Sequence, residues 1–321
     1  RLIGDDQQLA AIGAGGVLRD IEASHGALRL SELVRFADPA EGSASLALRE
    51  GQPEALGFYL DRERVRVGNQ ETMADQLFTA WAADRAAGRD SVMLAPTREL
   101  VADLNQRART HRLYGTSPGA VVELADGNPA SCGDVIITRH NDRRLRLNAT
   151  NWVKNGDRWT ISAITNEGVR ARHTQSGRHI TLRADYVAQW AELGYATTTH
   201  TAQGVTADTG HGMLTGDETR QQAYTMLTRG RRTNTCYLTV TGDGDPHTLI
   251  HPEVVHPATA VDQLERILAR DESPLSATTT LRQASDPALL LGDASARYAD
   301  AIVFAADHTT SPADRHTIQV A

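Results

Sequence analysis

Residues 71–108 read ETMADQLFTAWAADRAAGRDSVMLAPTRELVADLNQRA, and this stretch decides the fold class. Its first half carries an apolar residue at every fourth position, which is the spacing of one helix face: Met73, Leu77 and Trp81. The apolar run 91–95 then has the length of a buried strand, and Pro96 ends it. Thr97 follows with the side chain of a helix N-cap, ahead of a second helical pattern. The order helix, strand, turn, helix predicts an α/β domain.

From about residue 116 the pattern changes to short alternating runs broken by turn residues. These runs are 120–122, 134–138, 144–147, 159–161, 168–170 and 179–182. Short strands at such regular spacing predict a small antiparallel barrel, which we place at residues 116–187. Asn155-Gly156, between two short apolar runs, predicts a hairpin turn within it. The α/β pattern returns after Tyr195, so we expect an independent barrel inserted into an α/β domain.

Composition excludes several classes of protein. The chain has 321 residues, of which 40% are hydrophobic, so it can bury a core and is neither disordered nor fibrous. No apolar run approaches the roughly 20 residues that span a bilayer, so membrane insertion is not expected. Cys132 and Cys236 are too few for a disulfide scaffold, which favours the cytoplasm. The first residue is Arg1 rather than Met, which favours a fragment of a longer protein.

The charged residues are unevenly distributed. Of the 33 Lys and Arg residues only Lys154 is lysine, and it lies in V-K-N-G, so no Walker A motif exists within this sequence. Residues 133–187 hold ten basic and five acidic residues, a net charge of +5. Residues 241–321 hold five basic and twelve acidic residues, a net charge of −7. The middle of the chain can therefore attract phosphates, although a solvated arginine-rich surface is the alternative.

Four short segments matter together, and the glutamine of the first could hydrogen-bond a terminal phosphate or an attacking water. The first is Gly4-Asp5 followed by Gln8, and the second is Arg35. Taken alone, the first is also a common turn and the second a common surface residue. The third segment, GYATTTHTAQGVT at 194–206, is dense in hydroxyls, and the fourth, YTMLTRGRR at 224–232, is a helix whose end presents arginines.

In this order the four segments resemble motifs III, IV, V and VI of superfamily 1 DNA helicases of the RecD-like branch. The resemblance is strongest to the helicase part of conjugative relaxases of the MobF class, of TraA or TraI type. It implies an α/β fold: the second motor domain of a RecA-like P-loop NTPase, with an inserted SH3-like antiparallel β-barrel and a helical acidic tail. The implied segments are 1–36 (end of the first RecA-like domain), 37–115 and 188–242 (second RecA-like domain), 116–187 (barrel) and 243–321 (tail).

The same resemblance implies roles for individual residues. In catalysis, Gln8 senses phosphate, Arg35 is the first arginine and Arg229 is the arginine finger. The ATP-binding residues are Gly4, Asp5, Gln8, Gly204 and Arg229. The residues that contact single-stranded DNA are Thr97, Asn105, Thr199 and His200, and the basic excess adds Arg143 and Arg144.

The implied cofactors are ATP and Mg²⁺, with a P-loop and acidic metal ligand ahead of Arg1. We therefore expect this chain alone neither to bind ATP tightly nor to hydrolyse it. The expected partners are single-stranded DNA and the relaxase and first RecA-like domain of the same polypeptide. A secretion coupling protein is a further candidate.

Two other functions stay open at this level. One is a helicase-like module that binds single-stranded DNA without hydrolysing ATP, and the other is the RecD subunit of a repair exonuclease. Gln8, Arg35 and Arg229 favour a motor, because a pure binding module does not need to sense a terminal phosphate. His247, His251 and His256 offer only a weak metal pattern. Trp152, Trp159 and Trp190 suit either a barrel core or a platform for stacked bases.

Overall fold

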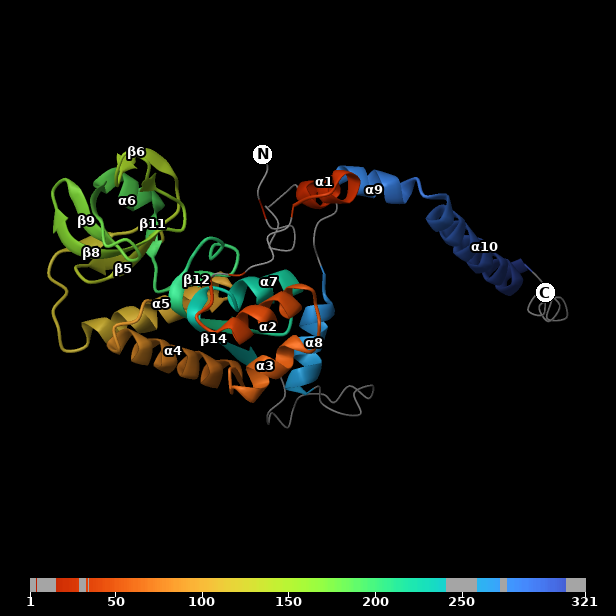
Figure 1. Cartoon of the computed structure of the whole chain (residues 1–321), viewed down its shortest axis with the longest axis horizontal. Coiled ribbons are helices and arrows are strands. Elements are labelled where there is room, and N and C mark those ends of the chain that lie inside the picture. The colour runs from red at the N-terminus through yellow and green to blue at the C-terminus, as the bar shows by residue number, and fades with distance from the viewer. Residues whose placement is uncertain are drawn as a thin grey trace. The chain divides into compact units, whose positions relative to one another are not determined.

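The computed structural model describes residues 4, 16–28, 33, 35–240, 259–271 and 276–309 (Figure 1). They fall into two compact units. The smaller unit contains helices α1 (Val17–His25), α9 (Ala277–Ala284) and α10 (Pro287–Thr309). The larger unit contains every element between residues 35 and 271. None of the described helices combines the length and apolar character needed to span a membrane.

The larger unit is built on a five-stranded parallel sheet with the order β1-β14-β13-β2-β12. The strands are β1 (Val65–Gly68), β2 (Ser91–Ala95), β12 (Ala196–Thr198), β13 (Ala207–Leu214) and β14 (Gly230–Thr239). β2 is buried along its whole length, as expected for a parallel sheet covered on both faces. The predicted α/β class with a buried strand at 91–95 is confirmed.

Helices cover both faces of this sheet. Their bounds are α2 (Pro39–Arg49), α3 (Ala55–Asp61), α4 (Gln70–Ala86), α5 (Arg98–Leu113), α7 (Arg220–Met226) and α8 (Ala260–Ala269). Met93 and Ala95 of β2 share a core with α4 and α5, whereas Val92 and Leu94 share a second core with α2, α3, α7 and α8. This alternation follows from the two-residue period of a strand. The predicted stripe of α4 is buried, with Leu77 fully enclosed.

The barrel strands lie between α5 and β12 in the chain. They are β3 (Val121–Glu123), β4 (Pro129–Ser131), β5 (Val135–Thr138), β6 (Asp142–Arg146), β7 (Trp152–Val153), β8 (Arg158–Thr165), β9 (Gly168–His173), β10 (His179–Arg183) and β11 (Ala191–Leu193), with helix α6 (Ala184–Trp190) before the last strand. The main sheet has the antiparallel order β10-β9-β8-β5-β11. Strand β11 pairs with β5 beyond the expected boundary at residue 187.

The hairpin predicted at Asn155-Gly156 is wrong, although the turn itself is present. β7 pairs with β6, and β8 pairs with β5 and β9, so the strands on either side of the turn are not partners. The turn instead docks on the end of β5: Gly156 N donates to Thr138 O at 2.8 Å, and Thr138 N donates to Asp157 O at 3.0 Å. Pairing with β5 has replaced the pairing that a two-stranded hairpin requires.

The barrel does not form the independent unit that we expected. One apolar cluster runs from Leu77 of α4 through Tyr195 to Trp159 in the barrel. The Tyr195 hydroxyl donates to buried Asp134 at 2.6 Å, and Arg112 of α5 donates to the same carboxylate at 2.6 Å. These shared contacts explain why the barrel and the parallel sheet belong to one compact unit.

The segment expected to form an acidic tail is divided. Helix α8 begins with a capping box at Thr259 and buries Leu264, Ile267 and Leu268 in the same core as α7. It therefore completes the larger unit, because without it this apolar surface would face water. Helices α9 and α10 belong to the smaller unit.

Candidate ATP-cleft and nucleic-acid site

Arg229 lies between the end of α7 and the start of β14, and only 1% of it is exposed. Its Nε donates to Thr225 O at 2.7 Å, and its Nη2 donates to Thr228 Oγ1 at 2.8 Å. Its Nη1 donates to Ala202 O at 3.3 Å, in the loop before β13. All of these acceptors are neutral, so the guanidinium is held in place while its charge is not balanced by them.

Arg35 lies beside Arg229, although the sequence separates them widely. Arg35 Nη1 donates to Thr228 O at 2.6 Å, on the residue directly before Arg229. Burial, followed by the neighbouring charge of Arg35, lowers the pKa of Arg229 to about 10, so it remains a cation at neutral pH. Neither arginine makes an ion pair with a carboxylate within the part of the chain that the structure describes. Two adjacent cations attract an anion.

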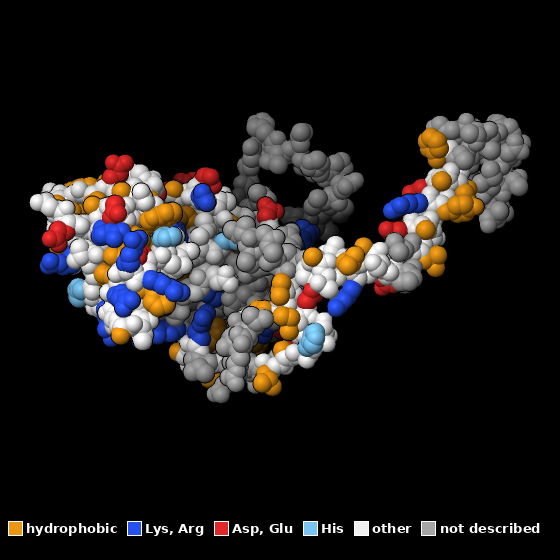
Figure 2. Space-filling model, turned by 90° about the horizontal axis from the view of Figure 1, so that it is seen from above, with side chains coloured by type: hydrophobic (Ala, Val, Ile, Leu, Met, Phe, Trp, Pro, Cys, Tyr) orange, Lys and Arg blue, Asp and Glu red, His pale blue; other side chains and the backbone are white. Residues whose placement is uncertain are grey.

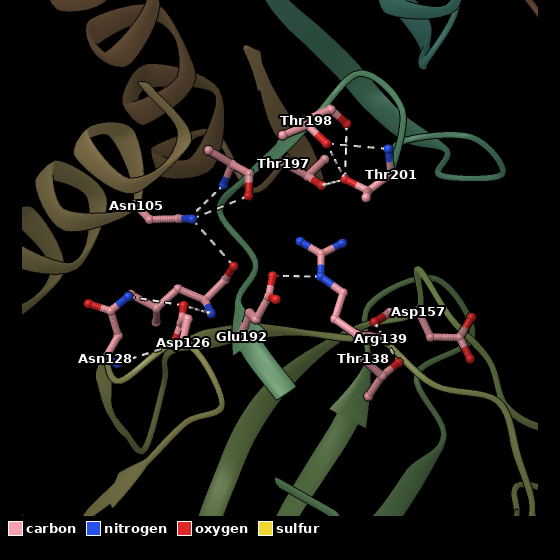
Figure 3. Close-up of polar contacts among 12 residues, drawn as sticks. Asn105, Asp126, Asn128, Thr138, Arg139, Asp157, Glu192, Thr197, Thr198 and Thr201 are labelled. Carbon is pink, nitrogen blue, oxygen red and sulfur yellow. Dashed lines mark hydrogen bonds and ion pairs between the residues drawn. The ribbon is translucent and has the colours of Figure 1, made fainter. Parts of the chain in front are cut away.

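A group of threonine hydroxyls lies at the carboxyl edge of the parallel sheet (Figure 3). Thr197 and Thr198 end β12, and Thr201 lies in the loop that follows it. Thr201 Oγ1 is 2.6 Å from Thr197 Oγ1 and 2.8 Å from Thr198 Oγ1. Thr97 follows neighbouring β2, is exposed and caps α5 by accepting from Leu100 N at 3.3 Å. Thr198 pairs with Ala95 in parallel register, so both groups lie at the same sheet edge. Hydroxyls and a helix N-terminus suit backbone phosphates.

Two residues expected to contact DNA are buried. Asn105 is 4% exposed and holds the chain that returns from the barrel: its Oδ1 accepts from Ala196 N at 2.8 Å, and its Nδ2 donates to Ala196 O at 3.3 Å and Leu193 O at 3.4 Å (Figure 3). We therefore expect Asn105 to have a structural role in place of the DNA contact that the resemblance implies, because its amide bonds the backbone on either side of Gly194 and Tyr195. Thr199 is 2% exposed and its Oγ1 contacts no hydrogen-bonding partner among the described atoms. His200, next to it, is exposed.

Removing the Asn105 amide should destabilise the protein without affecting DNA affinity. Asn105→Ala leaves buried backbone groups of Leu193 and Ala196 without partners, and each such group costs about 1–3 kcal/mol. We expect urea denaturation to show a loss of about 2 kcal/mol. Single-strand affinity, measured by fluorescence anisotropy below the unfolding transition, should match the wild type. A selective loss of affinity would restore the original assignment.

The barrel carries the remaining basic and aromatic candidates on its surface. Figure 2 shows Lys and Arg side chains gathered over the end of the molecule that carries the barrel. Arg143 and Arg144 are exposed, and the Arg143 guanidinium lies 5.1 Å from the Trp152 ring. Trp190 is 39% exposed and stacks on His140, with ring centroids 4.7 Å apart. Trp159, by contrast, is fully buried, so it belongs to the barrel core, whereas Trp190 presents part of its ring to solvent.

A polar cavity of about 270 Å³ lies between the barrel and the loop that follows β12. Its walls include Lys154 and His173 from the barrel and Gly204 from the loop. Gln175 joins the two sides by donating to Thr206 O at 2.7 Å. Gly204 has a φ of 88°, a left-handed conformation that glycine adopts without strain. This places Gly204 beside the barrel.

The predicted phosphate-sensing segment lies mostly outside the described residues. Asp5 and Gln8 fall outside them, and Gly4 is exposed. His247, His251 and His256 also fall outside. Among the residues that are described, no group of three or more His, Cys, Asp or Glu side chains is arranged to hold a metal ion.

Sequence reasoning missed the polar residues that hold the segment after Arg229. Asn234 and Glu41 are both fully buried and hydrogen-bonded to each other, although they lie 193 residues apart. No local pattern marks either residue. Glu41 is an acidic residue in the first turn of a helix, where acidic residues are common. Only a signal that couples distant positions could have identified them.

Comparison with known proteins adds family relationships to this geometry. Residues 1–70 match the family described as an AAA domain, and residues 122–192 match the Rv2311 SH3-like barrel domain. Rv2311 of Mycobacterium tuberculosis is 36% identical over 122 residues, which are 37% of this chain and 67% of Rv2311. The conjugal transfer protein TraA of Agrobacterium fabrum is 29% identical over 238 residues, or 72% of this chain and 21% of TraA. RecD of Mycolicibacterium smegmatis is 28% identical over 256 residues, or 72% of this chain and 43% of RecD.

Among solved structures, the Pif1 helicase of Candida albicans aligns with a TM-score of 0.43 at 13% identity and covers 74% of this chain and 64% of that one. The chain is related to the superfamily 1 helicases of the RecD-like branch, including the TraA conjugal transfer proteins and RecD. It shares the SH3-like barrel family of Rv2311. It spans about a fifth of the length of TraA, 21% in the Agrobacterium protein.

Proposed function

We propose that this chain is the second motor lobe of an ATP-dependent DNA helicase or translocase that forms part of a conjugative relaxase. In this proposal a P-loop domain ahead of Arg1 binds ATP and Mg²⁺, and this chain closes the nucleotide cleft. Relatedness to TraA and RecD supports a helicase-like function in DNA processing. The observation that carries the finer proposal is the pair of adjacent arginines, Arg35 and Arg229.

The chemistry of this pair suits phosphoryl transfer. Charge builds up on the oxygens of the transferring phosphoryl group, and an arginine that is already in place stabilises it without reorganisation. Arg229 is buried, charged and bonded only to neutral oxygens, so an arriving phosphate would compensate a charge that the described residues leave unbalanced. Arg35 touches the preceding carbonyl and would neutralise the same anion.

The proposed DNA path follows the carboxyl edge of the sheet and then the barrel. Thr97, Thr201 and His200 would contact phosphates, since all are exposed at that edge or in the loop that leaves it. The cavity beside Gly204 continues from this loop to Lys154. Phosphate contacts of this kind position a strand without reading its sequence, which a translocating motor requires.

Titration calorimetry with ATP and Mg²⁺ separates a motor lobe from a self-sufficient nucleotide-binding module. The proposal expects no tight binding by this chain alone, because the other wall of the cleft is missing. The two-lobe protein, meaning this chain together with the proposed P-loop domain, should bind ATP and hydrolyse it when single-stranded DNA is added. Micromolar binding by the isolated chain would contradict the two-lobe cleft.

The basic barrel surface should contribute to DNA affinity through phosphate contacts. Each such contact adds about 0.7 to the slope of log affinity against log salt for single strands, so Arg143→Ala with Arg144→Ala should lower the slope by about 1.4. Anisotropy titrations with oligo-dT at several salt concentrations measure it. Arg297→Ala is the matched control, because Arg297 is 83% exposed and pairs with Asp293 much as Arg144, 82% exposed, pairs with Asp142. If the wild type, the double variant and Arg297→Ala had the same salt slope, Arg143 and Arg144 would be solvated side chains that do not contact DNA phosphates.

A further inference from the structure

The backbone directly after Arg229 is held by one buried side chain. Asn234 is 0% exposed, its Oδ1 accepts from Gly230 N at 2.7 Å, and its Nδ2 donates to Gly230 O at 3.0 Å. A single amide thus satisfies both backbone groups of the residue that follows the arginine. These two bonds fix the peptide planes on either side of Gly230.

An irregularity in the sheet makes this support necessary. Ala207 of β13 pairs with Gly230, whereas Thr209 pairs with Thr233, so β14 has one extra residue at this point. Such a bulge removes regular ladder bonds and re-aims the neighbouring side chains. The Asn234 amide supplies the bonds that the bulge removes.

The bulge leaves no space for a side chain at position 230. A Cβ there would lie 2.2 Å from Thr233 O, 2.8 Å from Gly210 N and 3.0 Å from Asn234 Oδ1. Two of these atoms belong to the backbone and cannot rotate away. The close packing therefore requires glycine at position 230.

The orientation of the Asn234 amide is itself set from another part of the fold. Asn234 Nδ2 donates to Glu41 Oε1 at 2.8 Å, and Asn234 N donates to the same oxygen at 3.2 Å. The other oxygen of Glu41 accepts from Arg64 Nη1 at 2.5 Å. Since a carboxylate accepts only, it turns the Nδ2 group of Asn234 toward itself and leaves Oδ1 for Gly230.

We propose that Asn234, oriented by Glu41, is a positioning residue for Arg229. This inference rests on the proposed function of Arg229 as the arginine finger. Asn234 does not touch the phosphate but fixes the backbone from which Arg229 extends. A misplacement of about 1 Å can cost roughly 10²-fold in rate, so turnover should be sensitive to this amide.

The test is steady-state ATP turnover of the two-lobe protein with saturating single-stranded DNA. Asn234→Ala should lower kcat by about 10²-fold and change KM for ATP much less, because the arginine acts mainly in the transition state. Asn105→Ala is the matched control, since it removes another buried amide with three backbone hydrogen bonds. It should lower stability while leaving kcat near that of the wild type.

Two substitutions of Glu41 test the orientation of the amide and cover the case in which Asn234→Ala does not fold. Glu41→Gln keeps an oxygen that can accept from Asn234 Nδ2 and Asn234 N, and loses only the charge that pairs with Arg64, so it should keep most of kcat. Glu41→Ala removes the acceptor that orients the amide, so it should lower kcat. Equal kcat in Asn234→Ala and Asn105→Ala, or in Glu41→Ala and Glu41→Gln, would overturn the inference.

The two proposals fail in different ways. If Arg229→Ala leaves turnover intact, the proposed function fails. If Arg229→Ala abolishes turnover while Asn234→Ala retains it, only the positioning role fails. Hydrogen exchange at the Arg229 Nε–H, followed by NMR in the isolated chain, adds a readout without catalysis: Asn234→Ala should accelerate it and Asn105→Ala should not.

Discussion

Arg229→Ala in the two-lobe protein should reduce DNA-stimulated ATP turnover by on the order of a thousandfold, because arginine fingers contribute about 10³ to 10⁵ in related phosphoryl transfers. DNA affinity should change little, since Arg229 is 1% exposed and its donors are directed at Thr225, Thr228 and Ala202 inside the protein. Arg229→Lys should recover little activity, because an ammonium cannot reproduce the planar fork that bonds Thr225, Thr228 and Ala202. A malachite green phosphate assay measures the turnover.

Arg231→Ala is the control for this experiment. Arg231 lies two positions away, its side chain is 51% exposed, and among the described carboxylates it pairs with Asp208, at 3.7 Å. It should lose far less activity than Arg229→Ala. If turnover survived Arg229→Ala within a factor of about ten, below the range of a finger, the assignment of the motif would be wrong.

Asp134→Ala should produce the largest loss of stability. The Asp134 carboxylate is fully buried and accepts from Arg112, from the Tyr195 hydroxyl and from Ser131 N at 2.7 Å. Burial raises the pKa of this carboxyl, but the hydrogen bonds from Arg112 and Tyr195 outweigh burial and lower it. Removing one partner of a buried pair costs about 3–5 kcal/mol, so the melting temperature should fall by on the order of 10 °C.

Differential scanning calorimetry compares this variant with Asp103→Ala. Asp103 also pairs with an arginine of α5, Arg107, at 2.8 Å, but its side chain is 46% exposed. Exposed pairs contribute about 0–1 kcal/mol, so this control should melt within a few degrees of the wild type. Similar melting of the two variants would mean that the contact between α5 and the barrel is not stabilised by Asp134.

Local patterns predicted the elements whose signal is local. Helix α4 was predicted because Met73, Leu77 and Trp81 form one apolar face, and the structure buries all three. Helix α2 was not, because its buried face consists mainly of small and polar residues: Glu41, Gly42, Ala44, Ser45 and Leu48. A hydrophobic period does not detect a helix whose contacts are of this kind.

Pairing over long distances could not be predicted. The turn at Asn155-Gly156 has the sequence of a hairpin, yet it docks on Thr138 of β5 because that strand end offers both a donor and an acceptor. Asn105 has the polarity of a DNA contact, but the chain returning from the barrel, 88 residues further along, takes its amide. Local sequence patterns show which groups can form hydrogen bonds. They do not show which distant residues provide the partners.

In the candidate site, too, local features were predicted and long-range contacts were not. The hydroxyl-rich segment and the arginine-bearing helix end were visible in the sequence, whereas the proximity of Arg35 to Arg229 was implied only by resemblance. It depends on a hydrogen bond between residues 193 positions apart, from Arg35 to Thr228. The supporting amide of Asn234 depends on an equally long connection to Glu41.

A structure of the two-lobe protein with ADP, aluminium fluoride, Mg²⁺ and a single-stranded oligonucleotide tests the central proposal most directly. The decisive measurement is the distance from the Arg229 guanidinium to the fluoride that mimics the transferring phosphoryl group. We expect a hydrogen bond of about 3 Å, donated by an N–H group of Nη1 or Nη2 that does not bond Ala202 or Thr228. A guanidinium that stays on the carbonyls of Thr225 and Ala202, with the nucleotide beyond its reach, would contradict the proposed finger and the motor function built on it.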